Sequence, residues 1–201
     1  MTKIKICGLS RSEDIDYVNE ARPDFCGFVI NVKKSRRCVS PDTVRSLVSR
    51  LSDGILPIGV FVNEDAAAVA SLLEDGTLYA AQLHGDEDEE YIKSLRQLTD
   101  KPIIRAFRVK SREDIAAAEK CSADYILLDS GAGSGVTFDW SIISGISRPY
   151  FLAGGLGAEN ISSAIEKLHP FAVDMSSGVE TNGLKDRQKI MDAVAAVRCA
   201  Q

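Results

Sequence analysis

The chain has 201 residues, of which 45% are hydrophobic and 26% are charged, and its formal net charge is −5 at pH 7. This composition is ordinary for a globular protein, and the acidic balance argues against a general nucleic-acid binder. No stretch reaches the apolar length that crosses a bilayer, and the N-terminus lacks a signal-peptide core, so we expect a cytoplasmic protein without a membrane partner. Five scattered cysteines without a CxxC pair, and only two histidines, favour free thiols over disulfides or a metal site.

Short apolar runs alternate with amphipathic segments along the whole chain. The apolar runs predict strands at 3–7, 24–30, 57–62, 78–83, 103–107, 124–129, 150–153 and 171–175. The segments after them predict helices at 12–20, 41–51, 65–74, 87–98, 111–120, 139–146, 158–168 and 185–198. Eight strand–helix units are typical of a (β/α)8 or TIM barrel, and we predict a single α/β domain of this kind over residues 1–201. A doubly wound open sheet would show the same alternation and is the alternative fold.

In a (β/α)8 barrel the chemistry gathers at the C-terminal ends of the strands, so the residues that end the predicted strands are the site candidates. They are Cys7, Asn31, Asn63, Gln82 with His84, Arg105 with Phe107, Asp129, Gly154 with Gly155, and Ser176 with Ser177 and Gly178. Lys5 and Cys7 share one face of the first strand, and we expect both to point into the barrel mouth. A nearby ammonium would favour the thiolate and lower the pKa of Cys7. The alternative is that Cys7 is only a small buried hydrophobe.

Polar and glycine residues also end three later strands. Asp129 follows an apolar run, where it either caps the next turn or serves as an acid or base, and the pattern leaves both open. Gly154 and Gly155 precede a predicted helix, and Ser177 and Gly178 follow the last predicted strand. These two loops are the common phosphate site of the fold, and their joint placement favours a phosphate ligand over tight turns alone.

Nine stretches, in order along nearly the whole chain, resemble the phosphoribosylanthranilate isomerase family. They are KICGL (5–9), GFVI (27–30), SRRCVSP (35–41), GVFVN (59–63), QLHGDE (82–87), LLDS (127–130), GSGVTFDW (133–140), LAGGL (152–156) and FAVDMSSGVE (171–180). The most specific combination is KICG near the start with VDxSSGVE near the end. Two stretches depart from the usual pattern: Asn31-Val32 replaces a common aromatic–proline pair, and GAGSG (131–135) replaces a more usual GG pair.

The resemblance implies a cofactor-free Amadori rearrangement in tryptophan biosynthesis. This reaction converts N-(5-phosphoribosyl)anthranilate to 1-(2-carboxyphenylamino)-1-deoxyribulose 5-phosphate. It implies that Cys7 is the general base and Asp129 the general acid, and that Arg37, matched through an S-x-R stretch, holds the anthranilate carboxylate. The candidates for substrate binding are Lys5, Arg37, Gln82, His84, Gly154, Gly155, Ser177 and Gly178. No metal or cofactor is expected.

Two other functions compete with this assignment. The phosphoribosyl isomerase of histidine synthesis runs similar chemistry with two carboxylates, but here Cys7 replaces the first of them, and the second half of that family's longer chain is absent. A non-catalytic barrel that senses a sugar phosphate would keep Gly154, Gly155 and Ser177 without needing Cys7 and Asp129 together. The expected partner is a small-molecule substrate. The sequence leaves the oligomeric state open, with a monomer as the simplest case.

Overall fold

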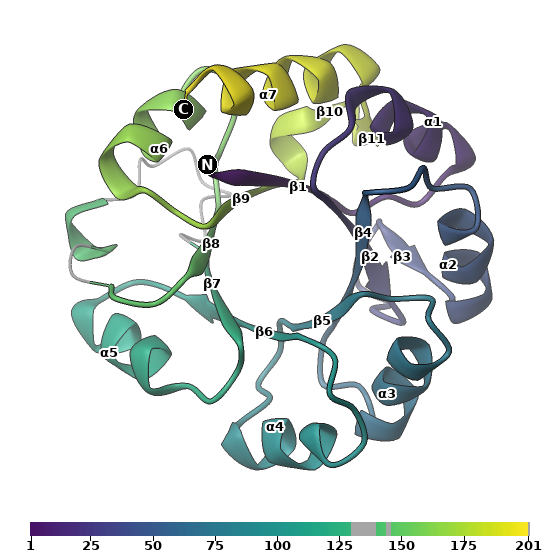
Figure 1. Ribbon diagram of the computed structural model, residues 1–201, viewed down its shortest axis with the longest axis vertical. Coiled ribbons are helices and arrows are strands. Elements are labelled where there is room, and N and C mark those ends of the chain that lie inside the picture. Colours follow the sequence, from purple (N-terminus) through teal and green to yellow (C-terminus); the bar gives the residue numbers. More distant parts are fainter. Residues whose placement is uncertain (130–139, 144–145, 201) are drawn as a thin grey trace.

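The computed structural model describes residues 1–129, 140–143 and 146–200. Eight parallel strands form a ring (Figure 1): β1 (Lys3–Cys7), β2 (Phe25–Ile30), β4 (Leu56–Phe61), β5 (Ala80–Leu83), β6 (Ile103–Arg108), β7 (Tyr125–Asp129), β8 (Tyr150–Ala153) and β9 (Ala172–Met175). Their hydrogen-bonded order is β1-β9-β8-β7-β6-β5-β4-β2, and the pairing of β1 with β2 closes the ring. The closed ring confirms the (β/α)8 barrel and excludes the open doubly wound sheet.

Helices surround the ring of strands (Figure 1): α1 (Ser12–Ala21), α2 (Pro41–Val48), α3 (Ala66–Glu74), α4 (Glu89–Arg96), α5 (Arg112–Lys120), α6 (Ile161–Leu168) and α7 (Arg187–Cys199). Four of them begin after a Ser or Asp whose side chain accepts a backbone N–H of the first turn, namely Ser40, Asp65, Asp88 and Asp186. Such N-caps satisfy donors that the helix itself leaves unpaired. Among the described residues, no helix has the length and apolar character needed to cross a membrane.

The structure differs from the sequence prediction in three segments. Of the helix predicted at 139–146, the described residues form a 3₁₀ turn, η1 (Trp140–Ile143), and the GAGSG loop lies outside the described residues. An additional short strand, β3 (Cys38–Val39), pairs with β2. After β9 come a 3₁₀ turn, η2 (Ser177–Val179), and a hairpin of β10 (Glu180–Thr181) and β11 (Leu184–Lys185). Both additions shape the rim at the C-terminal ends of the strands.

Strand β1 shows how the barrel sorts its side chains. Ile4 and Ile6 are fully buried in the core between strands and helices. Lys3, Lys5 and Cys7 alternate with them and face the barrel interior, because successive side chains of a strand point to opposite faces. At the N-terminal end of the barrel Lys3 lies over the rings of Phe25 and Phe171, 5.4 and 5.0 Å from their centroids. One strand therefore spans an aromatic end, a buried centre and an open end.

Candidate active site

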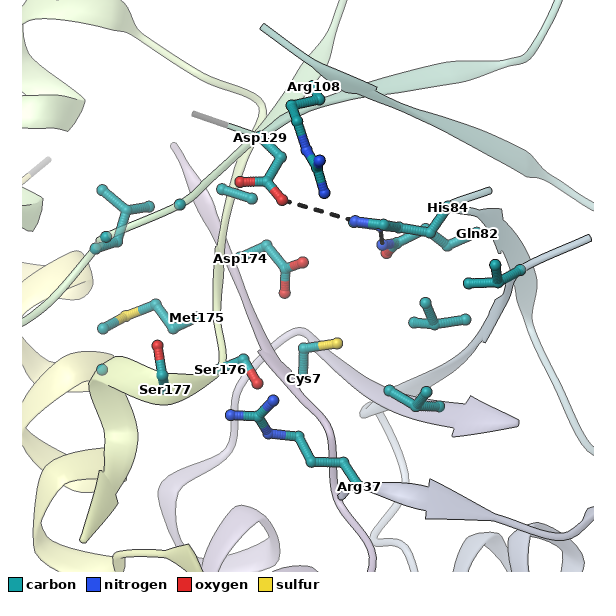
Figure 2. A pocket seen from close by; sticks show the side chains of 18 residues that line it. Cys7, Arg37, Gln82, His84, Arg108, Asp129, Asp174, Met175, Ser176 and Ser177 are labelled. Carbon is teal, nitrogen blue, oxygen red and sulfur yellow. Dashed lines mark hydrogen bonds and ion pairs between the residues drawn. The ribbon is translucent and has the colours of Figure 1, made fainter. Parts of the chain in front are cut away.

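A pocket of about 420 Å³ opens at the C-terminal ends of the strands. Ten of the predicted site residues line it: Cys7, Arg37, Gln82, His84, Asp129, Gly154, Gly155, Ser176, Ser177 and Gly178. Figure 2 shows Cys7 and Asp129 on opposite sides of this pocket, with Asp174 between them in this view. The volume falls in the range of sites for small-molecule ligands. The closure of the barrel thus brings together residues that the sequence holds far apart.

Lys5, a predicted substrate-binding residue, does not line the pocket. It is fully buried, and its Nζ lies 3.0 and 3.1 Å from the two carboxylate oxygens of Asp174 and 2.9 Å from Oε1 of Gln82. Burial acts to lower the pKa of Lys5, but Asp174 and Cys7 outweigh it and raise the pKa above its ordinary value. Lys5 therefore contacts two residues that do line the pocket, Asp174 and Gln82.

Cys7 lies at the bottom of the pocket and is 8% exposed. A Cβ added at Gly27 would stand 2.8 Å from its Sγ and 3.1 Å from Nζ of Lys5, so glycine at this position leaves room for both side chains. Burial raises the pKa of the Cys7 thiol, and the opposing effect of Lys5 does not reverse this shift. Lys5 does act to lower this pKa, as expected from the sequence, but desolvation dominates and the net shift is upward.

Asp129 ends β7 on the other side of the pocket, next to His84. The Oδ2 of Asp129 lies 3.6 Å from Nε2 of His84, and Nδ1 of His84 lies 2.9 Å from Nε2 of Gln82. The Asp129 and His84 side chains are 24% and 33% exposed, so both reach the open space of the pocket. A carboxyl group and an imidazole in this position can exchange protons with a bound ligand.

The glycine loops after β8 and β9 pack against each other. Gly154 and Gly155 have φ angles of +95° and +62°, a region that residues with a side chain adopt rarely. A Cβ at Gly178 would stand 2.1 Å from the carbonyl oxygen of Leu156, so a side chain there would force the two loops apart. Both loops line the pocket, as does Ser177. The two predicted phosphate loops therefore form one continuous wall.

Arg37 enters the pocket from the loop before β3 and is held by Glu180. Its Nε and Nη2 donate to Oε1 and Oε2 of Glu180 over 2.6 and 2.8 Å, a bidentate geometry. Lys185 donates to the same carboxylate over 2.7 Å. Burial acts to raise the pKa of Glu180, but Arg37 and Lys185 overcome it and lower this pKa to about 2. Arg36 also pairs with Glu180, over 2.5 Å, but its side chain is 59% exposed and does not line the pocket.

Steric constraints explain why glycine follows Cys7. Gly8 has a φ of +83°, and a Cβ at this position would stand 2.3 Å from Cδ of Arg37. A side chain at position 8 would strain the backbone and displace the arginine. The Cys-Gly pair therefore places a thiol in the pocket and leaves room for a cation beside it.

Sequence reasoning missed several residues that build the site. They are Arg108 and Asp174, which line the pocket, and Glu180 and Lys185, which lie behind Arg37. One signal was available for Asp174, a carboxylate inside the apolar run of the last barrel strand. Its significance depends on the pairing of β1 with β9, which puts Lys5 in register with Asp174. Sequence alone does not give that register.

The end of β6 was assigned to the wrong residue. Arg105, named from the sequence, does not line the pocket and donates to the carbonyl oxygens of Leu83 and Gly85 over 3.1 and 3.0 Å. The strand runs to Arg108, and the residues that face the interior are Ala106 and Arg108. A shift in the predicted end of the strand was enough to exchange one arginine for the other.

The titratable groups of the site do not form a metal centre. Within residues 1–129, 140–143 and 146–200, no three His, Cys, Asp or Glu side chains are placed to hold a metal ion. The chemistry that the geometry offers is proton transfer between an acidic and a basic group on two sides of one pocket.

Residues 4–196 match the family described as N-(5'phosphoribosyl)anthranilate (PRA) isomerase. The chain belongs to this family. A PRA isomerase from Endomicrobium trichonymphae is 45% identical over 203 residues, which cover 98% of this chain and 99% of the relative. The crystal structure of the Thermotoga maritima PRA isomerase is similar with a TM-score of 0.88 and 36% identity, covering 99% and 100% of the two chains.

A further similar structure bears directly on the pocket. It is a PRA isomerase in complex with reduced 1-(o-carboxyphenylamino)-1-deoxyribulose 5-phosphate, with a TM-score of 0.86 and 35% identity, covering 99% of this chain and 100% of that one. The resemblance drawn from the sequence motifs is thereby confirmed. The family assignment decides against the isomerase of histidine synthesis and against a non-catalytic sensor, because the matched relatives are PRA isomerases.

Proposed function

We propose that Cys7 and Asp129 are the general base and the general acid with which this chain isomerises N-(5'-phosphoribosyl)anthranilate in tryptophan biosynthesis. The observation that carries the proposal is the order of the strands. β1, which ends in Cys7, and β7, which ends in Asp129, flank β9 and β8, the two strands that lead into the glycine loops. A substrate anchored by its phosphate on these loops would place its sugar between the thiol and the carboxyl group.

The opposite wall of the pocket suits the aromatic part of this substrate. Val29 on β2, Val60 on β4 and Val62 after β4 line the pocket, and β4 lies across the ring from β8. An apolar wall removes the anthranilate ring from water, which is favourable in proportion to the buried area. One wall of the pocket thus consists of glycine loops that suit the phosphate, and the opposite wall consists of valines that suit the aromatic ring.

The proposed reaction needs two proton transfers on different sides of one sugar. Asp129 gives a proton to the ribose ring oxygen, the C1′–oxygen bond breaks, and the open chain becomes a protonated Schiff base. Cys7, as the thiolate, removes the C2′ proton, and the electron pair of that bond neutralises the Schiff-base nitrogen to give an enolamine. Tautomerisation of the enolamine yields the ketone. Groups fixed on separate strands can hold these positions without rearrangement.

Two charged ends of the substrate require local positive features in an acidic chain. We assign the phosphate to the backbone of Gly154, Gly155, Ser177 and Gly178, because glycine lets N–H groups approach phosphate oxygens closely. We assign the anthranilate carboxylate to Arg37, whose guanidinium Glu180 holds at the edge of the pocket. All these residues come from one chain, so a monomer is sufficient for the reaction.

The test is a turnover assay on the purified protein with fluorescent phosphoribosylanthranilate generated in place. We expect the fluorescence to disappear with wild type and to persist with Asp129→Asn, which keeps the size and polarity of the side chain but has no carboxyl proton to give. The melting temperature of Asp129→Asn should stay near that of wild type. If Asp129→Asn is largely unfolded, but its remaining folded fraction turns over at the wild-type rate, Asp129 only caps the turn after β7.

A further inference from the structure

We propose that Gln82 is a positioning residue that fixes His84 as the neutral Nε2–H tautomer, so that the imidazole donates this hydrogen to Oδ2 of Asp129. The inference rests on the proposed role of Asp129 and states how its proton is placed. Its basis is a continuous chain of contacts from Lys5 through Gln82 and His84 to Asp129. Figure 2 shows the part of this chain from Gln82 to Asp129.

The first step is the orientation of the Gln82 amide. An ammonium has three donors and no acceptor, so the group that Nζ of Lys5 meets at 2.9 Å must be the carbonyl oxygen of Gln82. A flipped amide would put its NH₂ group against the ammonium. Lys5 is fully buried and Gln82 is 1% exposed, so little water could relieve such a contact. Lys5 therefore fixes the amide with its oxygen toward β1 and its nitrogen toward His84.

The second step is the tautomer of His84. The amide nitrogen of Gln82 lies 2.9 Å from Nδ1 of His84, and an amide NH₂ can only donate. Nδ1 must then offer its lone pair, because a proton on Nδ1 would meet another donor. The ring hydrogen is left on Nε2, which faces Oδ2 of Asp129 at 3.6 Å. Contacts of this length between catalytic groups commonly tighten when substrate binds.

Three polar side chains surround the imidazole of His84. Asp129 from β7, Gln82 from β5 and Arg108 from β6 line the same part of the pocket as His84. Oδ2 of Asp129 faces Nε2, and the amide nitrogen of Gln82 faces Nδ1, so only the Nε2 side of the ring meets an acceptor. A doubly protonated His84 would need a new partner for Nδ1.

The consequence concerns the acid step. A neutral N–H donor on Oδ2 makes that oxygen the acceptor of the carboxyl group, so the acidic proton resides on Oδ1. When Oδ1 gives this proton to the ribose ring oxygen, the resulting carboxylate can accept the Nε2–H of His84 at Oδ2. His84 thereby sets which oxygen of Asp129 delivers the proton, and Gln82 sets His84.

The experiment uses two-dimensional ¹H–¹⁵N spectra of the histidine rings in ¹⁵N-labelled protein. The chain has only two histidines. His169 has a φ of 45°, which Asn tolerates, so His169→Asn assigns the signals of His84. In wild type we expect Nδ1 of His84 at the shift of an unprotonated ring nitrogen and Nε2 at that of a protonated one. In Gln82→Glu, a carboxylate oxygen faces Nδ1, so Nδ1 should become protonated.

Turnover provides the second measurement. Gln82→Glu should lower kcat by up to about 100-fold, the effect of a misplaced catalytic group, with a smaller change in KM. Gln97→Glu, the same substitution at an exposed position, should keep the wild-type spectrum and turnover. A wild-type His84 that carries its proton on Nδ1 would overturn the proposal, whether or not Gln82→Glu folds. Unchanged turnover in Gln82→Glu would refute its functional part. The tautomer reading is independent of the Asp129→Asn assay, because it is measured on the resting protein.

Discussion

The two ends of this barrel are built by the same strands but differ in polarity, packing and open volume. At the N-terminal end the rings of Phe25, Tyr125, Phe151 and Phe171 pack with centroids 5.0 to 6.4 Å apart, and the space left between them is only about 30 Å³. At the C-terminal end, polar and glycine residues at or just after the strand ends surround about 420 Å³ of open space. Stability and chemistry are thus assigned to opposite ends of one structure.

Between the two ends lies a buried charged pair. Lys5 is held by Asp174 and Gln82 in the centre of the barrel, and it separates the aromatic end from the pocket that Cys7 lines. The comparison shows that the role of an inward-facing side chain depends on whether it lies near the N-terminal or the C-terminal end of its strand. Substitutions at the open end should therefore change turnover, and substitutions at the closed end should change stability.

Cys7→Ala should have the largest effect at the open end. Loss of a general base typically costs about 10²–10⁴-fold in rate, while affinity for a product analogue should change little because the thiol is not an anion site. Wild-type kcat/KM should rise with pH through the alkaline range, since burial raises the pKa of Cys7 and the thiolate is the active form. Steady-state kinetics across pH checks both points. Cys199→Ala, at an exposed thiol, is the control. Near wild-type turnover in Cys7→Ala would contradict the assignment of Cys7 as the general base.

Phe151→Ala should show the opposite behaviour at the closed end. Phe151 is 1% exposed and contacts three aromatic rings, so its truncation should reduce the free energy of unfolding by about 3–5 kcal/mol. The folded protein should keep its kcat, because Phe151 does not line the pocket. Urea unfolding and turnover at low temperature measure the two effects. Leu98→Ala, at a 49% exposed position, should be close to wild type in both. A large loss of kcat in folded Phe151→Ala would contradict the separation of the two ends.

Arg37→Ala should weaken binding of a product analogue by about 1.5–3 kcal/mol, the range for hydrogen bonds to a charged group. Arg37→Lys should recover only part of this, since an ammonium lacks the two parallel donors of the guanidinium. Arg36→Ala should cost less, because Arg36 does not line the pocket. Calorimetry with the analogue and with a version lacking the carboxylate tests the assignment. A full penalty for Arg37→Ala with the truncated analogue would make Arg108 the next candidate.

Glu180→Gln should have the smallest effect, visible as a change in the pH dependence of stability. The folded protein holds the pKa of Glu180 at about 2, below the ordinary 4.5, so its contribution is present above pH 4.5 and lost as the pH falls toward 2. The variant should be less stable by about 1 kcal/mol at pH 6, since both arginines reach solvent, and should approach wild type near pH 2. Urea titrations at several pH values measure this. If Glu90→Gln, at an exposed carboxyl, behaves identically, the effect is not specific to Glu180.

The architecture could be predicted because its signals are local. Apolar runs and amphipathic segments follow from the period of each element, and the predicted strands lie within a few residues of the observed ones. β3 escaped prediction because two residues carry no periodicity. The helix predicted at 139–146 rested on a short amphipathic pattern, and within it the structure describes a 3₁₀ turn at Trp140–Ile143.

Apart from Arg37, which the family resemblance indicated, the site could be predicted only where residues end a strand in sequence or follow its end. Cys7, His84 and Asp129 met that condition, and the pocket contains all three. The pairing of Lys5 with Asp174 depends on strand register, and the clamp of Glu180 on Arg37 joins residues 143 positions apart. The pKa of Cys7 was predicted in the wrong direction because sequence shows a neighbouring charge but not the desolvation that outweighs it.

The most direct test of the central claim is a crystal structure of this protein with a reduced analogue of the isomerisation product. The account predicts the phosphate on the backbone of Gly154, Gly155, Ser177 and Gly178. It predicts C2′ within about 3–3.5 Å of Sγ of Cys7, the separation of reacting atoms, with the Asp129 carboxyl on the other side of the sugar. A phosphate bound instead at residues 33–37, or a sugar that contacts only one of Cys7 and Asp129, would contradict it.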